Sequence, residues 1–104
     1  MLTDKQIANI RKGLNGAAQR AVFKILAEAN RYRISQILDA YPQLTVSDLS
    51  KILHISIPLA SQHLKVLEQG GILQKEKRGR KVYFKLRTDN RIAQAIIQKI
   101  IIIK

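Results

Sequence analysis

Cationic side chains crowd the stretch from residue 75 to residue 91. Eight lysines and arginines lie there against Glu76 and Asp89, which leaves a surplus of +6, half of the net charge of +12 carried by the 104 residues. Cations at this density attract a polyanion, either nucleic acid or an acidic membrane surface. A charge run can also be a solvated face, but concentration around one glycine, Gly79, weakens that reading. The cations nearest Gly79 are candidates for contact with phosphates: Lys77, Arg78, Arg80 and Lys81.

Polar side chains with hydrogen-bonding capacity lie on a second stretch, residues 57–70. Apolar residues recur there at helical spacing and predict a buried stripe of Ile57, Ala60, Leu64 and Leu67. On the opposite face glutamine can pair with adenine, serine can donate or accept, and leucine can meet a thymine methyl. We therefore expect base contacts from Pro58, Leu59, Ser61, Gln62 and His63. Ser56 and Lys65 are placed for phosphates, and His63, at the flank, has a structural role as its alternative.

These side chains need a helix that stands out from its domain, and residues 45–70 have the spacing of a helix-turn-helix. Thr45 and Asp48 predict the start of a short first helix. After a three-residue turn, Ser56 can cap a second helix that tolerates Pro58 in its first turn. A glycine pair ends that helix. In such a unit the second helix can enter the major groove of DNA.

A β-hairpin is predicted immediately after the second helix. Residues 72–77 and 82–86 form two short stretches, the second with alternating apolar and polar side chains, and Gly79 supplies the turn. The hairpin makes residues 72–87 a wing, so the unit is a winged helix-turn-helix. The basic part of the wing, residues 77–82, can follow the DNA backbone or enter the minor groove.

Helical periodicity also covers the first 40 residues and resumes from Asp89. The isoleucine-rich tail is apolar nearly all round and must be buried, so we expect it to pack against a second copy. The predicted dimer contacts in the tail are Ile96, Ile97, Ile100 and Ile101. We expect residues 1–104 to form a single, mostly α domain in the order α-α-α-α-β-β-α, as a homodimer.

Composition argues against several other classes of protein. No apolar run approaches the roughly 20 residues of a membrane-spanning helix, and no secretory signal is visible, so we expect no membrane insertion and a cytoplasmic location. Cysteine is absent, the two histidines are nine residues apart, and the seven acids are scattered. These residues form no pattern for acid–base, nucleophilic or metal chemistry, so we expect no enzyme, no metal and no cofactor.

Three segments resemble the ArsR-type repressors. Residues 23–34, FKILAEANRYRI, are similar to that family's opening FKALADPTRLRI. Residues 61–73, SQHLKVLEQGGIL, resemble its SxHLKVLxxAGLV, and residues 79–86, GRKVYFKL, resemble its wing GRxVYYxL. The resemblance covers residues 23–87 in the family's order and spacing.

The resemblance implies a homodimeric repressor on a winged-helix fold that pairs through its first and last helices, here residues 1–28 and 89–104, which adds Ile7, Ile10 and Leu14 to the predicted dimer contacts. It carries DNA reading onto Ser61, Gln62 and His63, and backbone contact onto the wing. The family's metal sites are not matched. Thr45 and Ser47 stand where many members have Cys-x-Cys, and hydroxyls are poor ligands for the metals involved.

Other members of the family bind zinc through Asp-x-His with a later His and Glu. Here Asp89 is followed by Arg91, and no His or Glu comes after it. Members that sense redox state need cysteine, which this chain lacks. Two other functions stay open from the residues alone: a winged-helix module that docks on proteins, which the basic wing disfavours, and an RNA-binding module, for which A-form grooves give a recognition helix little to read.

Overall fold

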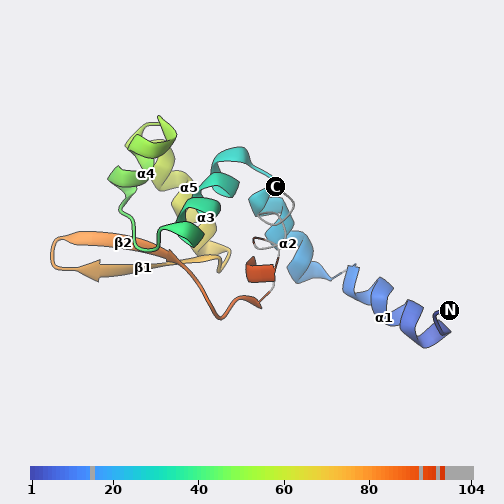
Figure 1. The fold of residues 1–104 in the computed structure, drawn as a ribbon. Helices are drawn as coiled ribbons and strands as arrows, with labels where there is room; N and C mark the ends of the chain where they lie inside the picture. The colour runs from blue at the N-terminus through green and yellow to red at the C-terminus, as the bar shows by residue number, and fades with distance from the viewer. Residues whose placement is uncertain (15, 92, 96, 98–104) are drawn as a thin grey trace.

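The computed structural model describes residues 1–14, 16–91, 93–95 and 97. Five helices precede a two-stranded antiparallel sheet, and helical residues resume at 91 (Figure 1). The elements are α1 (Asp4–Leu14), α2 (Ala17–Leu26), α3 (Ala29–Ala40), α4 (Val46–Leu53), α5 (Ile57–Gln69), β1 (Leu73–Arg78) and β2 (Lys81–Leu86). The mostly helical fold with one hairpin is confirmed. The helix order is corrected, because five helices and not four precede the hairpin.

The additional helix arises from two interruptions in the N-terminal 40 residues. Gly16 has extended backbone angles at the start of α2. Glu28, also extended, accepts a hydrogen bond from the Arg31 backbone N–H at 2.9 Å and so begins α3. The Arg31 guanidinium donates to the Ile25 carbonyl at 2.7 Å, which satisfies a carbonyl at the end of α2. Apolar periodicity runs through both breaks, so spacing alone does not reveal them.

Local hydrogen bonds fix the helix-turn-helix formed by α4 and α5. Thr45 and Asp48 make a reciprocal capping box at the start of α4, with bonds of 3.0 and 3.1 Å. His54 ends α4 in the left-handed region at φ 55°. The Ser56 hydroxyl then accepts from the Leu59 N–H at 3.2 Å and caps α5. The predicted short helix, turn and longer helix are confirmed.

The core lies where α3 and α5 meet the hairpin and α2. Ala60, Leu64 and Leu67 of the predicted stripe are buried, but Ile57 is 50% exposed. Ile57 is the first residue of α5 and therefore projects beyond the part of the helix that packs on α3 and α4. The buried apolar side chains form one cluster: Val22, Leu26, Ile34, Leu38, Leu49, Leu64, Leu67, Ile72, Leu73, Ala93 and Ile97.

The hairpin is attached to the helices at its base. In the strand register Leu73 is opposite Leu86 and Arg78 is opposite Lys81, so Gly79 and Arg80 form the turn. Gly79 has a φ of +61°, the conformation that a glycine at the first central position of a tight hairpin supplies. Leu44, just before α4, pairs with Phe84 through backbone hydrogen bonds of 2.8 and 3.3 Å. The wing is therefore held against the start of the helix-turn-helix.

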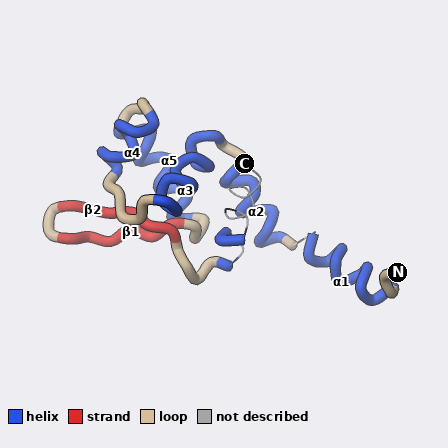
Figure 2. Tube along the Cα trace, in the orientation of Figure 1, coloured by secondary structure: helices blue, strands red, loops and turns tan. Residues whose placement is uncertain are grey.

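The molecule is elongated, with extents of 56 × 26 × 20 Å. The hairpin projects at one end and α1 at the other, well away from the core (Figure 2). Ile7 on α1 is 40% exposed, whereas Ile97 is buried at 1% in the core that also contains Val22 and Leu26. Burial within its own chain removes Ile97 from the predicted dimer contacts.

The remaining predicted contacts are not described. Ile10 and Leu14 belong to α1, but their side chains fall outside the described part of the chain. Ile96, Ile100 and Ile101 lie outside the described residues altogether.

Candidate nucleic-acid interface

The outer face of α5 presents the residues that were predicted to contact bases. Pro58, Ser61 and Gln62 are exposed, and Leu59 is 38% exposed. Gln62 makes no side-chain hydrogen bond to another described residue. The Gln62 amide therefore keeps both its donors and its acceptor for a bound molecule. Ser56 and Lys65 were predicted to contact phosphates. Ser56 is exposed at the start of α5, and Lys65 is exposed further along the same helix.

His63 departs from its neighbours on α5, because only 8% of it is exposed. Its Nδ1 lies 3.7 Å from Glu28 Oε2, and the same carboxylate oxygen accepts the hydrogen bond that begins α3. His63 thus bridges α5 to the start of α3. The contact with Glu28 and the burial of the His63 side chain favour a structural role for His63 over contact with a base.

The hairpin has two faces with different partners. Strand alternation and the register place Lys75 and Lys77 on the face that carries Val82 and Phe84. Arg78, Lys81, Tyr83 and Lys85 lie on the opposite face. A groove runs between the first face and α5, and Val46, Leu64, Val82 and Phe84 form its apolar lining beside the polar or charged Ser61, Lys65, Glu68, Gln69, Lys75 and Lys77.

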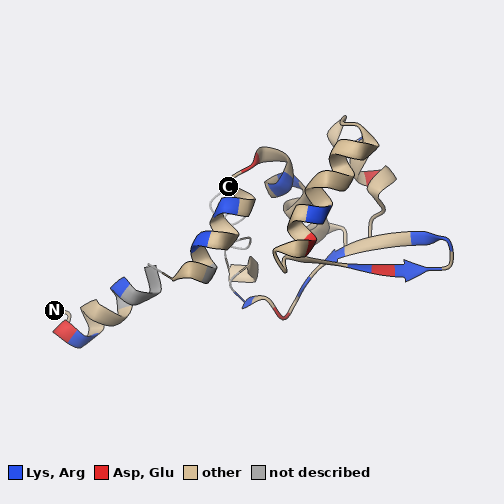
Figure 3. Ribbon diagram, turned by 180° about the vertical axis from the view of Figure 1, so that it is seen from behind, with Lys and Arg blue, Asp and Glu red and all other residues tan. Residues whose placement is uncertain are grey.

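Ion pairs neutralise some of the wing cations and leave others. Glu76 lies 3.3 Å from Arg78 and 3.8 Å from Lys85, and Glu68 of α5 lies 3.7 Å from Lys75. Within the described part of the chain, no such pair engages Lys65, Lys77, Arg80 or Lys81. Figure 3 shows the basic colour at the hairpin tip, with further cations on α5 and α2. The unneutralised cations therefore surround the outer face of α5 and the hairpin tip.

Asp48 is an acid close to this basic surface. The Thr45 backbone N–H, which donates to the carboxylate at 3.0 Å, is the main reason that the pKa of Asp48 lies below its ordinary value. The positive charges of Lys51 and Lys81 lower it further. Asp48 is thus ionised at neutral pH and committed to capping α4.

Sequence reasoning missed three contacts that position the interface: Glu28 with His63, Leu44 with Phe84, and Asn90 with Gly71. Each joins residues far apart in the chain, and no periodic pattern marks them. Glu28 is not one of the residue types that usually cap a helix, and the apolar spacing continues across it, so no sequence signal marked this cap.

The described residues show no metal centre and no membrane span. No three histidine, cysteine, aspartate or glutamate side chains among them come together as metal ligands. No helix in the described ranges has the length and apolar character to cross a membrane.

Comparison with known proteins identifies relatives of the whole arrangement. The model of the bacterial regulatory protein ArsR family matches residues 28–75, which include α3, α4, α5 and the start of the wing. A cadmium resistance transcriptional regulatory protein CadC homolog of Staphylococcus aureus is 33% identical over 78 residues, 75% of this chain and 63% of that protein. The transcriptional repressor SdpR of Bacillus subtilis is 30% identical over 67 residues, 64% of this chain and 73% of SdpR.

The fold has solved counterparts. Reduced HlyU from Vibrio cholerae superimposes with a TM-score of 0.76 and 26% identity, over 89% of this chain and 95% of HlyU. The chain spans only part of the length of curated relatives that it matches, at 63%, 51% and 56% for three of them. The segment that matches the family model includes the helix-turn-helix, and this chain has the same fold as HlyU. The chain belongs to the ArsR family of bacterial regulatory proteins.

Proposed function

We propose that this protein is a homodimeric regulator of transcription that binds double-stranded DNA and represses by occupying a promoter. One observation carries the proposal: the polar outer face of α5 is exposed beside the wing cations Lys77 and Arg80, which no ion pair of the described chain engages. The relatives CadC and SdpR, named as a transcriptional regulatory protein and a transcriptional repressor, support it. A chromosomal partner would place the protein in the cytoplasm.

The N-terminal half of α5 reads the bases in this proposal. Recognition helices present their first residues to the floor of the major groove, and Pro58, Leu59, Ser61 and Gln62 occupy those positions. Gln62 supplies a donor and an acceptor that match the edge of adenine. His63, buried beside Glu28, is assigned a structural role in this proposal and not base contact.

Phosphate contacts surround this helix. Lys65 and Lys77 face the groove between α5 and the wing, whose apolar lining suits the sugar of one DNA strand. Ser56 lies at the helix start, where N–H groups attract phosphate. The hairpin tip adds Arg78, Arg80 and Lys81. These contacts set position and affinity but carry no sequence information of their own.

In the proposal a second copy of the chain completes the DNA-binding unit as a homodimer. Ile7 on α1 and Phe23 on α2, which is 55% exposed, are apolar side chains that the described chain leaves uncovered. Burial between two copies would cover them, together with the isoleucine-rich tail of the sequence. Two α5 helices related by a twofold axis would then face successive major grooves, about 34–36 Å apart.

Selection from a random pool of duplexes, followed by sequencing of the bound molecules, tests this function. We expect an inverted repeat whose half-sites lie about one helical turn, 10–10.5 base pairs, apart. A parallel pool of structured RNA serves as the comparison. Enrichment of RNA, or of no common duplex sequence, would contradict the proposal.

A further inference from the structure

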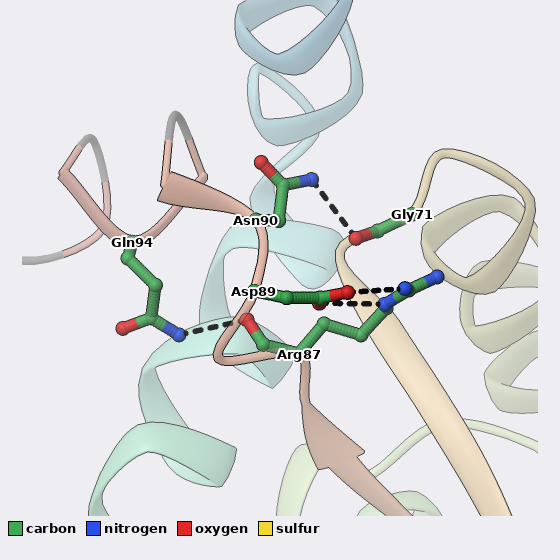
Figure 4. A network of polar contacts seen from close by, with 5 residues as sticks. All are labelled: Gly71, Arg87, Asp89, Asn90 and Gln94. Carbon is green, nitrogen blue, oxygen red and sulfur yellow. Dashed lines mark hydrogen bonds and ion pairs between the residues drawn. The ribbon is translucent and has the colours of Figure 1, made fainter.

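Asn90 uses both ends of its side-chain amide to join two elements. Its Nδ2 donates to the Gly71 carbonyl at 2.9 Å, across 19 residues of sequence. Its Oδ1 accepts from the Ala93 N–H at 3.0 Å and so caps the helical segment that resumes at residue 91. Figure 4 shows the first of these bonds, which crosses from the connector after β2 to the turn at Gly71.

The acceptor belongs to the turn that ends α5. The Gly71 N–H donates to the Glu68 carbonyl at 3.0 Å, and the left-handed φ of Gly71, +75°, fixes the direction of its peptide group. Movement of the C-terminal end of α5 would therefore move the carbonyl that Asn90 binds. A Cβ at position 71 would lie 3.6 Å from Asn90 Nδ2, so the side chain sits closely against the turn.

The capped segment is anchored elsewhere. Ala93 and Ile97 are both 1% exposed and belong to the core cluster with Val22 and Leu26 of α2. Asn90 therefore links the end of α5 to a segment that shares the core cluster with α2, and α2 carries the exposed Phe23 of the proposed dimer contact.

Other polar contacts of the connector are more local. Gln94 Nε2 donates to the Arg87 carbonyl at 3.1 Å, and Arg87 pairs with Asp89 at 2.6 Å. The Arg87 N–H also reaches the Ile72 carbonyl at 2.9 Å, which extends the strand pairing. Among the side-chain hydrogen bonds of the described connector, the Asn90 bond is the one that reaches the end of α5.

We infer that Asn90 is a positioning residue that sets the angle of α5 against the dimer-forming part of the molecule, and hence the half-site spacing that the dimer accepts. The inference rests on the proposed function, because it requires a twofold dimer on duplex DNA. It assigns spacing selectivity to a residue whose side-chain amide is bonded within its own chain. Asn90 is intermediate in exposure and already uses its amide within the chain.

Two substitutions at Asn90 remove the hydrogen bond to Gly71 but keep the cap on the helical segment. Asn90→Ser keeps an oxygen that can cap the helix but is too short to donate to Gly71. Asn90→Asp keeps the cap and replaces the donor by an acceptor facing a carbonyl. Gln94→Met is the matched control, because it removes a side-chain bond of similar length, at 3.1 Å, within the connector. Each variant is titrated with a single half-site duplex, with the selected palindrome, and with palindromes whose spacer is lengthened or shortened by two base pairs.

We expect Asn90→Ser and Asn90→Asp to bind the single half-site as the wild type does, and to bind the palindrome about fivefold more weakly. The ratio of their affinity for the native spacer to their affinity for an altered spacer should fall by a similar factor. Gln94→Met should keep the wild-type ratio. Thermal unfolding checks that each variant is folded. Wild-type spacing preference in both Asn90 variants would overturn the inference alone, as would equal losses on half-site and palindrome. A wild-type protein without any spacing preference would overturn the proposed function, a twofold dimer on an inverted repeat, and the inference with it.

Discussion

Gln62 is the side chain on which sequence discrimination depends most in this account. Its amide is exposed on the N-terminal half of α5 and has no partner among the described residues, whereas the neighbouring His63 is buried. Residue type and helical spacing were sufficient to predict that Gln62 faces outward from α5; its contact with a base stays a prediction. They were insufficient for His63, because a residue at the flank of a helix faces solvent or protein according to what packs beside it.

Gln62→Ala should weaken binding to the selected operator by roughly 1–3 kcal/mol and leave binding to random duplex unchanged. The reason is that a bidentate base contact is lost while the phosphate contacts remain. Gln74→Ala is the matched control, since Gln74 is an exposed glutamine opposite Lys85, on the face of the hairpin that turns away from the groove. Anisotropy titrations measure both; equal losses on operator and random duplex would remove Gln62 from base reading.

Asp48 contributes to stability through its cap, and its lowered pKa fixes the pH range of that contribution. A carboxyl whose pKa is lower in the folded state stabilises the fold at pH values above its unfolded pKa. That stabilisation is lost as the pH falls through the folded pKa. Asp48→Ala should therefore cost about 0.5–2 kcal/mol at neutral pH.

The cost of Asp48→Ala should shrink as the pH falls below about 4, the ordinary pKa of an aspartate, toward the lowered pKa of the folded state, where the wild-type carboxyl takes up a proton. Denaturant unfolding at pH 7 and at pH 2.5–3 measures the difference. Asp4→Ala is a control, an exposed acid in the first turn of α1. A difference between wild type and Asp48→Ala that is the same at both pH values would refute the role of the ionised cap.

At the scale of elements, the wing divides its cations between two faces. Lys77 faces the groove beside α5, whereas Lys85 lies on the opposite face and pairs with Glu76 at 3.8 Å. The alternation of the strands was visible in the sequence, but which face turns toward α5 was not. That choice depends on the pairing of Leu44 with Phe84, which joins segments 40 residues apart.

Lys77→Gln should weaken operator and random duplex alike and lower the slope of log affinity against log salt by about one phosphate contact. Lys85→Gln should leave the slope unchanged, because its ammonium faces away from the groove. Titrations over a range of salt concentrations give both slopes. Equal slopes for Lys77→Gln and wild type would exclude the groove face of the wing from the interface.

The element boundaries show what local sequence can and cannot predict. The caps at Thr45 and Ser56 were predicted because each needs residues only three positions apart. The break between α2 and α3 was not, because Glu28 is an unusual cap and the apolar spacing continues across it. Ile57 was misassigned to the buried stripe for a related reason: periodicity shows a face, but not where packing along that face begins.

At the scale of the whole molecule, α1 projects from the body (Figure 1). Phe23 of α2 is exposed. The fold class could be predicted from the order of helices and hairpin. The assignment of Ile97 to a dimer contact could not be corrected from sequence, because an isoleucine in a tail fills its own core or a partner's surface with equal ease. The link between Asn90 and Gly71 was likewise unpredictable, since it depends on how the ends of two elements meet.

Phe23→Gln should raise the dissociation constant of the dimer at least about tenfold, because burying a phenylalanine side chain contributes about 1.5–3 kcal/mol. Tyr41→Gln is the control, an aromatic residue that is 69% exposed at the end of α3. Sedimentation equilibrium at micromolar concentration measures both. A monomeric wild type, or an unchanged constant for Phe23→Gln, would remove this face of α2 from the contact.

The central claim is that charge brings this protein to DNA and the outer face of α5 selects the site. The most direct test is the affinity of the wild-type protein for its selected palindrome and for a shuffled duplex of the same composition, measured at the same salt concentrations. We predict binding to the palindrome at least about a thousandfold tighter at physiological salt, with both affinities falling as salt rises. Equal affinities for the two duplexes would contradict the account, because a protein with a net charge of +12 would then bind DNA without reading it.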